Sequence, residues 1–452
     1  MTSDETLGGR SATAALPGVL DRLIAPTRRD DFAARVWGRL PLLAPGCGSG
    51  RGTTAASPVA QVSDAADHGI ADLFSAAAVD ELLTRRGLRA PFVRMATQGR
   101  TLADADFTSG GGVGAGIRDQ VSDDRVRSRF ASGATIVLQG LHRTWSPIID
   151  FSQSLAAELG HPVQVNAYIT PPGNQGFSAH YDVHDVFVLQ IQGTKAWRVH
   201  APVWVDPLRT QPWDERRDAV AKAAAQPPLI DSDVCAGDVL YLPRGYIHAA
   251  TAPSDRDVSI HLTVGIHTWT RAHLVDAALD EVRRTLARQP ELRTSLPLGV
   301  DVQDPGSLES DAALVRDAIA FAAGQVGDAA LADALFATAR SSQRAAPLSV
   351  LGQVANADAI RPESKLTVRP HLLATLEHDS TSGQVTVRSR AGRSPFEGSS
   401  VDALRQLLDG APIVASDLEP HDSGAAVESA RRLLLDGIAV LARDDLAQDD
   451  PA

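Results

Sequence analysis

The sequence predicts an α+β protein in which a β-rich region is followed by a helical region and a small mixed domain. Two observations predict this order. Between about residues 91 and 268, short apolar runs alternate with Gly- and Pro-rich turns and long helices are few, a pattern typical of a sandwich or small barrel. After Trp269 the apolar residues change to a helical spacing. The length of 452 residues fits roughly two to four domains.

Composition excludes several classes of protein. Apolar residues make up 44% of the chain, so a sizeable core can form and a wholly disordered chain is excluded. The net charge of −12 argues against nucleic acid or an anionic membrane as the main partner. Two cysteines cannot build a disulfide framework. No apolar run approaches the roughly 20 residues of a membrane-spanning helix, and we identify no signal peptide, so we expect a cytoplasmic protein.

The N-terminal and β-rich regions are predicted from turn residues and apolar runs. We expect a flexible tail at residues 1–30 and short helices at 30–38 and 75–86, on either side of a loop rich in Gly, Ser and Pro at 43–70. The apolar runs that follow predict six strands, at 134–138, 164–169, 186–191, 196–199, 239–242 and 258–264.

The helical region begins with an apolar stripe. Val275, Leu279, Val282 and Leu286 lie at i, i+4, i+7 and i+11, on one face of a helix. A second helical stretch follows at about 308–340. Because such apolar faces need burial, we expect helices 271–340 to mediate a homodimer.

The mixed region 366–452 is predicted to contain short strands and helices. The strands are expected at 366–368, 385–387 and 438–441, and the helices at 401–408 and 425–436. The region holds 8 Arg against 14 Asp and Glu, a net charge of −6. Because a domain that binds duplex DNA is usually basic, we expect a structural or protein-binding role.

Three potential metal ligands stand in the β-rich region: His180, Asp182 and His248. Side chains two apart on a strand point to the same face, so the first two converge where a strand opens. A strand, a tight turn and a return strand then lead to His248, which a closed barrel brings opposite them. Two histidines and one carboxylate form the facial triad of non-haem Fe(II) oxygenases. An H-x-D pair is common by chance, so structural histidines remain an alternative.

The segments around these residues carry a family resemblance. NAYITPPGNQG at 166–176, HYD at 180–182 and FVLQIQGTKAWR at 187–198 resemble the JmjC-type ribosomal oxygenases, which are Fe(II)- and 2-oxoglutarate-dependent hydroxylases. WGRLPL at 37–42 and ELRTSLP at 291–297 extend the resemblance. It implies a JmjC/cupin catalytic domain, a double-stranded β-helix, at 31–268, a helical dimerisation domain at 269–348 and a winged-helix-like domain at 366–452.

The resemblance also implies roles for individual residues. It implies Fe(II) on His180, Asp182 and His248, and 2-oxoglutarate as co-substrate with its distal carboxylate on Lys195. Other matching positions are Asn166 and Ser259 for the co-substrate, and Tyr168, Gln139 and His142 for the substrate. The sequence departs from better-known members at His184, for which we expect hydrogen bonding or packing rather than ligation. We expect His261 to be a core histidine with a backbone partner.

The function expected from this resemblance is hydroxylation of a protein side chain, an arginine or histidine of a ribosomal protein. Another peptide or a small metabolite as substrate, a metal-binding cupin without oxygenase activity, and a non-enzymatic scaffold or DNA-binding regulator remain open. The expected partners are a ribosomal protein or other basic peptide and a second copy of the chain, with no direct nucleic acid and no membrane.

Overall fold

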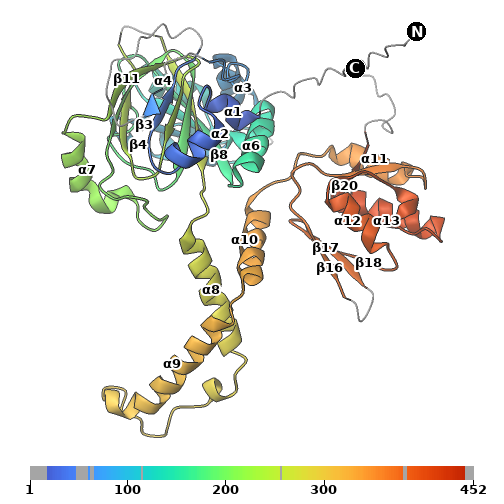
Figure 1. Ribbon diagram of the computed structural model, residues 1–452. Coiled ribbons are helices and arrows are strands. Elements are labelled where there is room, and N and C mark those ends of the chain that lie inside the picture. Colours follow the sequence, from blue (N-terminus) through green and yellow to red (C-terminus); the bar gives the residue numbers. More distant parts are fainter. Residues whose placement is uncertain are drawn as a thin grey trace, which may run out of the picture. The chain divides into compact units, whose positions relative to one another are not determined.

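A computed structural model describes residues 18–46, 60–61, 66–113, 116–254, 257–379 and 384–442 of the chain (Figure 1). The chain divides into two compact units, Met1–His267 and Thr268–Ala452, and each is described by itself. The expected loop at 43–70 lies largely outside the described residues.

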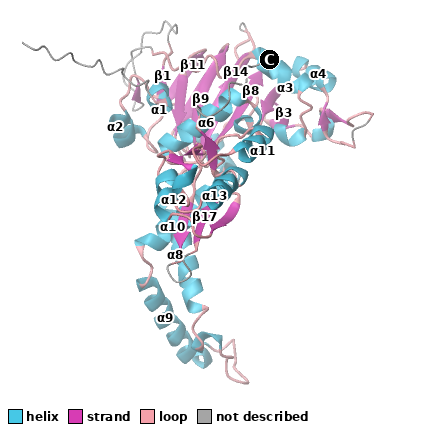
Figure 2. Cartoon of the chain, turned by 90° about the vertical axis from the view of Figure 1, so that its right-hand side faces the viewer, coloured by secondary structure: helices cyan, strands magenta, loops and turns pink. Residues whose placement is uncertain are grey.

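Two sheets form the framework of the first unit. Figure 2 shows β9, β14 and β8 side by side in the larger sheet. Its nine strands, in spatial order, are β2 (Ala60–Gln61), β1 (Leu42–Ala44), β12 (Val239–Leu242), β9 (Asp185–Gln192), β14 (Ser259–Ile266), β8 (Val163–Thr170), β7 (Thr135–Leu138), β3 (Val93–Thr97) and β4 (Arg100–Thr101). The smaller sheet has the order β11 (Ile230–Cys235), β10 (Thr194–His200) and β13 (Ile247–Thr251), and β5 (Thr108–Ser109) pairs with β6 (Gln120–Val121).

The larger sheet has a helix-covered face and a barrel face. Val165, Ala167 and Ile169 of β8 belong to the large apolar core. Because successive side chains point to opposite faces, Asn166, Tyr168 and Thr170 face the other way. On β9, likewise, Phe187 and Leu189 join the large core, whereas Val186 and Val188 pack with Trp197 and Val199 of the smaller sheet. The space between the two sheets is therefore the interior of a barrel.

Helices cover the outer face of the larger sheet. Leu82 of α3, Val126 of α4 and Leu155 of α6 all lie in the large core with the strand residues. The helices of this unit are α1 (Val19–Leu23), α2 (Arg29–Asp31), a π-helical turn (Phe32–Val36), α3 (Ala76–Arg85), α4 (Asp123–Ala131), α5 (Leu141–Thr144), α6 (Ser146–Leu159) and α7 (Arg217–Ala224), with 3-10 turns at Ala90–Phe92, Asp104–Asp106 and Trp213–Arg216.

One expectation about this unit is wrong. The flexible tail at 1–30 does not extend through residues 18–24, because Leu23 and Ile24 are fully buried and Glu158 of α6 accepts hydrogen bonds from the first backbone N–H groups of α1. The β-rich region also contains a 14-residue helix, α6, which the sequence analysis missed. Its buried residues Ile148, Phe151 and Leu155 have helical spacing, a signal that the many strand-like runs outweighed.

The six predicted strands correspond to β7, β8, β9, β10, β12 and β14. β3, β11 and β13 were not among the six. β13 was expected only as the return strand after a turn, and β11, with the sequence IDSDVC, is too polar to stand out as an apolar run.

The second unit begins with helices and ends in a small mixed domain. α8 (Arg271–Leu286) packs with α9 (Glu309–Gly324) and α10 (Asp328–Ser342), so the single stretch expected at 308–340 is interrupted after Gly324. Between α8 and α9 the chain forms 3-10 turns at Glu291–Arg293 and Pro305–Leu308. The mixed domain comprises α11 (Val350–Ala359), β15 (Lys365–Val368), β16 (Thr375–His378), β17 (Val385–Ser389), β18 (Gly392–Phe396), α12 (Val401–Leu408), β19 (Ile413–Val414), a 3-10 turn (Ala415–Asp417), α13 (Ser423–Leu435) and β20 (Ala439–Leu441).

In the mixed domain, one sheet has the order β19-β15-β20 and a second has the order β16-β17-β18. α11, α12 and α13 supply Ala357, Leu404 and Leu433 to the core of this domain, in which Leu366 and Val387 are fully buried.

No single helix among the described residues has the length and apolar content needed to cross a membrane. One pair of segments, Pro305–Gly324 and Asp328–Ser342, reaches that length and composition when the two are taken together. The chain bends by 82° between them.

Candidate active site

The structure brings the three predicted metal ligands together. His180 and Asp182 lie just before β9 rather than inside it, and His248 lies on β13. An isolated antiparallel bridge joins the two histidines: the His180 N–H donates to the His248 carbonyl (3.2 Å) and the His248 N–H donates to the His180 carbonyl (2.8 Å). One ligand atom from each of the three residues lies within 4.8 Å of the others.

Backbone contacts orient both imidazoles. Nδ1 of His180 lies 2.7 Å from the Ser178 carbonyl, and Nδ1 of His248 lies 3.0 Å from the Tyr246 carbonyl. A ring that donates from Nδ1 keeps the lone pair on Nε2, the atom that can bind a metal. Nε2 of His248 lies 3.7 Å from Oδ2 of Asp182.

The protonation states suit a divalent cation. Burial lowers the pKa of His248 to about 4, so its imidazole is neutral at pH 7. Burial alone would raise the pKa of Asp182, but the neighbouring His184, His248 and His180 outweigh it and lower that pKa. Neutral imidazoles and an ionised carboxylate are the forms that bind metal, and two histidines with one carboxylate fit Fe(II).

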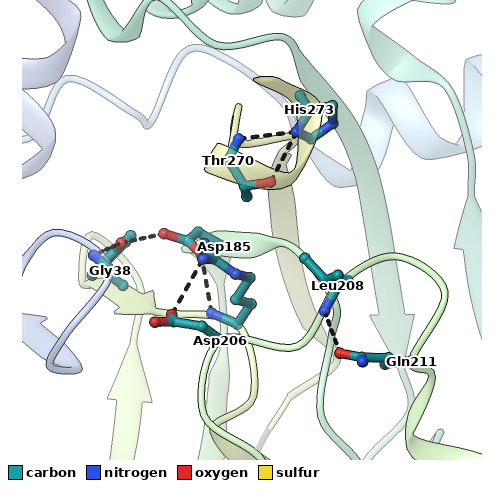
Figure 3. Close-up of polar contacts among 9 residues, drawn as sticks. Gly38, Asp185, Asp206, Leu208, Gln211, Thr270 and His273 are labelled. Carbon is teal, nitrogen blue, oxygen red and sulfur yellow. Dashed lines mark hydrogen bonds and ion pairs between the residues drawn. The ribbon is translucent and has the colours of Figure 1, made fainter. Parts of the chain in front are cut away.

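A buried ion pair holds the turn that leads to His248 (Figure 3). Asp185, the first residue of β9, is fully buried. It accepts hydrogen bonds from the Tyr241 hydroxyl (2.6 Å) and from the backbone N–H of Arg244 (3.1 Å), and its carboxylate lies 3.4 Å from the Arg244 guanidinium. The next residue, Gly245, donates its N–H to the Asp182 carbonyl (2.9 Å). The turn is therefore tied to both ligand-bearing segments.

Lys195 lies in the cavity beside these ligands. The cavity encloses about 580 Å³, including its open mouth, and lies between the two sheets. Lys195 of β10 is 4% exposed, and its ammonium donates to the Thr170 hydroxyl (3.1 Å). Burial lowers the pKa of Lys195 to about 7. A cation in this position suits a carboxylate that enters the cavity.

Of the other site residues predicted from the sequence, one lines the cavity and four do not. Tyr168 lines the cavity, and burial raises its pKa to about 12, so its hydroxyl stays protonated. Asn166 accepts a hydrogen bond from the Gly140 N–H (3.0 Å), and Ser259 accepts one from the Gln190 side chain (2.9 Å). His142 accepts from the Val165 N–H at Nδ1 (3.0 Å). The residues that form the cavity wall do not include Asn166, Ser259, His142 or Gln139.

The cavity wall also contains residues that the sequence analysis did not assign. Trp197, Phe177 and His261 line it. The expectation that His261 has a backbone partner is wrong for Nδ1, which is buried and has no partner among the described residues. His261 lies two residues after Ser259 on β14, so the two side chains share a strand face, and this spacing is the signal that the sequence holds for the position.

His184 does not belong to the ligand cluster. Its ring stacks on His267, with centroids 5.5 Å apart and planes at 21°. A Cβ at Gly265 would lie 2.6 Å from Nε2 of His184, so the imidazole occupies the space that the glycine leaves free. This placement agrees with the packing role expected for His184.

Comparison with known proteins gives a family for the region that contains the site. Residues 145–274 match the model of the JmjC domain. A bifunctional lysine-specific demethylase and histidyl-hydroxylase of Drosophila mojavensis is 35% identical over 143 residues, which make up 30% of this chain and 15% of that protein. Ribosomal oxygenase 1 of Gallus gallus is 30% identical over 287 residues, 61% of this chain and 41% of that protein.

Solved structures similar to this chain have a lower sequence identity than the curated relatives. The ribosomal oxygenase YcfD of Escherichia coli is similar over 92% of this chain and 98% of its own, with 16% identity and a TM-score of 0.49. The chain spans less than half the length of the curated relatives it matches. The family match confirms the resemblance on which the sequence analysis relied.

Proposed function

Residues 145–274 belong to the JmjC domain family, and from this premise we propose that the protein is an Fe(II)- and 2-oxoglutarate-dependent oxygenase that hydroxylates a side chain of a ribosomal protein. The observation that carries the proposal is the cluster of His180, Asp182 and His248 at the cavity that contains a buried lysine. A metal-binding cupin without oxygenase activity needs the cluster but has no use for a buried cation.

His180, Asp182 and His248 would hold Fe(II) at the cavity, where the co-substrate would reach the ion. When bound, Fe(II) with 2-oxoglutarate and O₂ supplies the oxidising power that converts a substrate C–H bond into an alcohol. The backbone carbonyls on Nδ1 of both histidines keep Nε2 directed to the ion. The Asp185–Arg244 pair keeps the segments that carry the ligands in register.

The cavity wall would bind the co-substrate and exclude water. The Lys195 ammonium pairs with the distal carboxylate, and Thr170 holds the ammonium in place. Val186, Val188 and Leu242 form an apolar wall beside the ligands, which limits access of water to the reacting atoms. The protonated hydroxyl of Tyr168 is available to donate to a polar group of the substrate. For Asn166 and Ser259 we keep co-substrate roles, and for Gln139 and His142 substrate roles, as part of the proposal.

The proposed substrate is an arginine or a histidine of a ribosomal protein. Relatives named as ribosomal oxygenases support this class, and the net charge of −12 suits a basic partner. Comparing the masses of ribosomal proteins from a wild-type and a deletion strain tests it. Loss of one oxygen atom from a single protein in the deletion strain is the expected result, and identical masses for every ribosomal protein would contradict this substrate.

Exposed apolar side chains on two helices of the second unit suggest how the protein assembles. Leu274, Val275 and Leu279 of α8 and Ile319 and Phe321 of α9 are exposed apolar side chains. We propose that they pack against a second copy in a homodimer. The proposal also keeps a winged-helix-like, protein-binding domain at 366–452 and a cytoplasmic location.

Substituting a ligand tests the catalytic part. His180→Ala or Asp182→Ala should abolish Fe(II)-dependent conversion of 2-oxoglutarate to succinate while the circular dichroism spectrum stays that of the wild type, because a barrel with a large apolar core does not need the metal to fold. His184→Ala is the matched control and should retain turnover. Succinate production at the wild-type rate by either ligand variant would contradict the assignment.

A further inference from the structure

Two residues that line the cavity each carry a buried side-chain nitrogen with no hydrogen-bond partner among the described residues. The nitrogens are Nε1 of Trp197 and Nδ1 of His261. The two side chains are only 5% and 3% exposed, and both line the cavity that contains Lys195. Buried polar groups are nearly always paired, and one left unpaired destabilises the folded protein. Because their side chains line the cavity, both nitrogens are candidates to hydrogen-bond a molecule that enters it.

The strand register places these residues along one path from the metal ligands to Lys195. His248 lies opposite Val199 of β10, and Trp197 and Lys195 follow at intervals of two residues. Each interval is about 7 Å along a strand, and side chains at these positions share a face. The Trp197 ring lies 5.9 Å from the His248 ring. Along the strands, Trp197 therefore lies between the position of His248 and that of Lys195.

Ring packing fixes His261 on the opposite wall. Its imidazole stacks on Tyr168, with centroids 5.0 Å apart and planes at 3°, and meets Trp197 edge-on at 5.6 Å. Burial, followed by the charge of Lys195, lowers the pKa of His261 well below its ordinary value, so the ring is neutral. In the tautomer that carries its proton on Nδ1, this ring donates a hydrogen bond without bringing a second positive charge beside Lys195.

We propose that Trp197 Nε1–H and His261 Nδ1–H bind the distal carboxylate of the dicarboxylate co-substrate together with the Lys195 ammonium. A carboxylate suits this set because it offers about four lone-pair directions and no donor. Thr170 already accepts from the ammonium, so the remaining hydrogens of Lys195 and the two ring N–H groups are available to one ligand group. This inference rests on the proposed function, because it concerns the same co-substrate.

The test measures binding rather than turnover. The probe is 2-oxoglutarate, titrated calorimetrically into the full-length Mn(II)-loaded protein without O₂ at pH 6.5, where Lys195 is charged. His261→Phe keeps the ring stack on Tyr168 and removes the nitrogen, and Trp197→Phe removes the indole N–H. Each should raise the Kd for 2-oxoglutarate by roughly 10- to 100-fold, and Mn(II) affinity should not change.

His200→Phe is the matched control. His200 is also a buried histidine of β10 whose Nδ1 has no partner among the described residues, but it does not line the cavity. Its substitution should leave the Kd unchanged. A second probe, 2-oxobutyrate, lacks the distal carboxylate and should bind wild type and His261→Phe equally.

The outcomes separate this inference from the proposed function. If the wild-type protein binds Mn(II) but no 2-oxoglutarate, the proposed function fails. If it binds 2-oxoglutarate and both ring variants bind it equally well, only the inference is overturned. If a variant does not fold, the indole N–H signals of the six tryptophans in wild-type protein decide the role of Trp197. One of them should shift when 2-oxoglutarate is added but not when 2-oxobutyrate is added, and the same shift with both probes would overturn the inference.

Discussion

Lys195 is the residue on which co-substrate binding should depend most. Truncating one partner of a buried charge pair usually costs about 2–5 kcal/mol. Lys195→Ala should therefore raise the KM for 2-oxoglutarate by at least tenfold and leave Fe(II) affinity nearly unchanged, because the metal ligands are intact. Lys195→Arg should also lose activity if the pocket fits only an ammonium. Titrating 2-oxoglutarate at fixed Fe(II) against the three proteins measures this, and an unchanged KM in Lys195→Ala would place the distal carboxylate elsewhere.

The lowered pKa of Lys195 predicts a pH dependence of co-substrate affinity. Burial favours the neutral amine, so in the free protein the ammonium form dominates below pH about 7 and is lost above it. Binding needs the ammonium, so the Kd for 2-oxoglutarate should be constant below that pH and rise up to tenfold per pH unit above it. Calorimetry on the Mn(II)-loaded protein between pH 6 and 9 checks this. The rise should be absent in Lys195→Ala, and a flat wild-type profile would contradict the prediction.

At the scale of elements, the buried Asp185–Arg244 pair should control how well the turn before β13 is held. Asp185→Asn leaves the guanidinium without its buried counter-charge, and breaking such a pair typically costs about 3–5 kcal/mol. Urea unfolding measures the loss. Asp206 pairs with the same guanidinium but is 53% exposed, so Asp206→Asn should cost less than about 1 kcal/mol. Equal losses in both variants would contradict the role of burial.

The elements also show what a sequence can and cannot reveal. β9 was predicted because its residues 186–189 form a continuous apolar run, and β8 and β14 because apolar residues recur along them between turn residues. His180 and Asp182 were expected to converge because they are two residues apart. They do so, although both lie before the first residue of β9. The missing partner of His261 could not be predicted, because hydrogen-bond satisfaction depends on atoms that distant strands bring together. α1 was missed for a similar reason, since Glu158 on another helix satisfies its first N–H groups.

At the scale of the whole molecule, the apolar side chains of α8 and α9 predict a dimer. Ile319→Glu combined with Phe321→Glu should convert a dimer into a monomer at micromolar concentration, because charges cannot be buried unpaired in an interface. Leu351→Glu is the matched control, as Leu351 is 84% exposed but lies on α11. Sedimentation velocity distinguishes the states. A wild-type protein that sediments as a monomer would contradict the dimer.

The contact between Gly265 and His184 links two positions that are far apart in the sequence. Any side chain at 265 would enter the space that the imidazole fills, since its Cβ would lie 2.6 Å from Nε2. The two positions are therefore expected to covary among homologues: those that keep histidine at 184 keep glycine at 265, and larger residues at 265 accompany smaller ones at 184. In a library randomised at both sites, folded variants should follow the same pairing, so one of the two residues predicts the other.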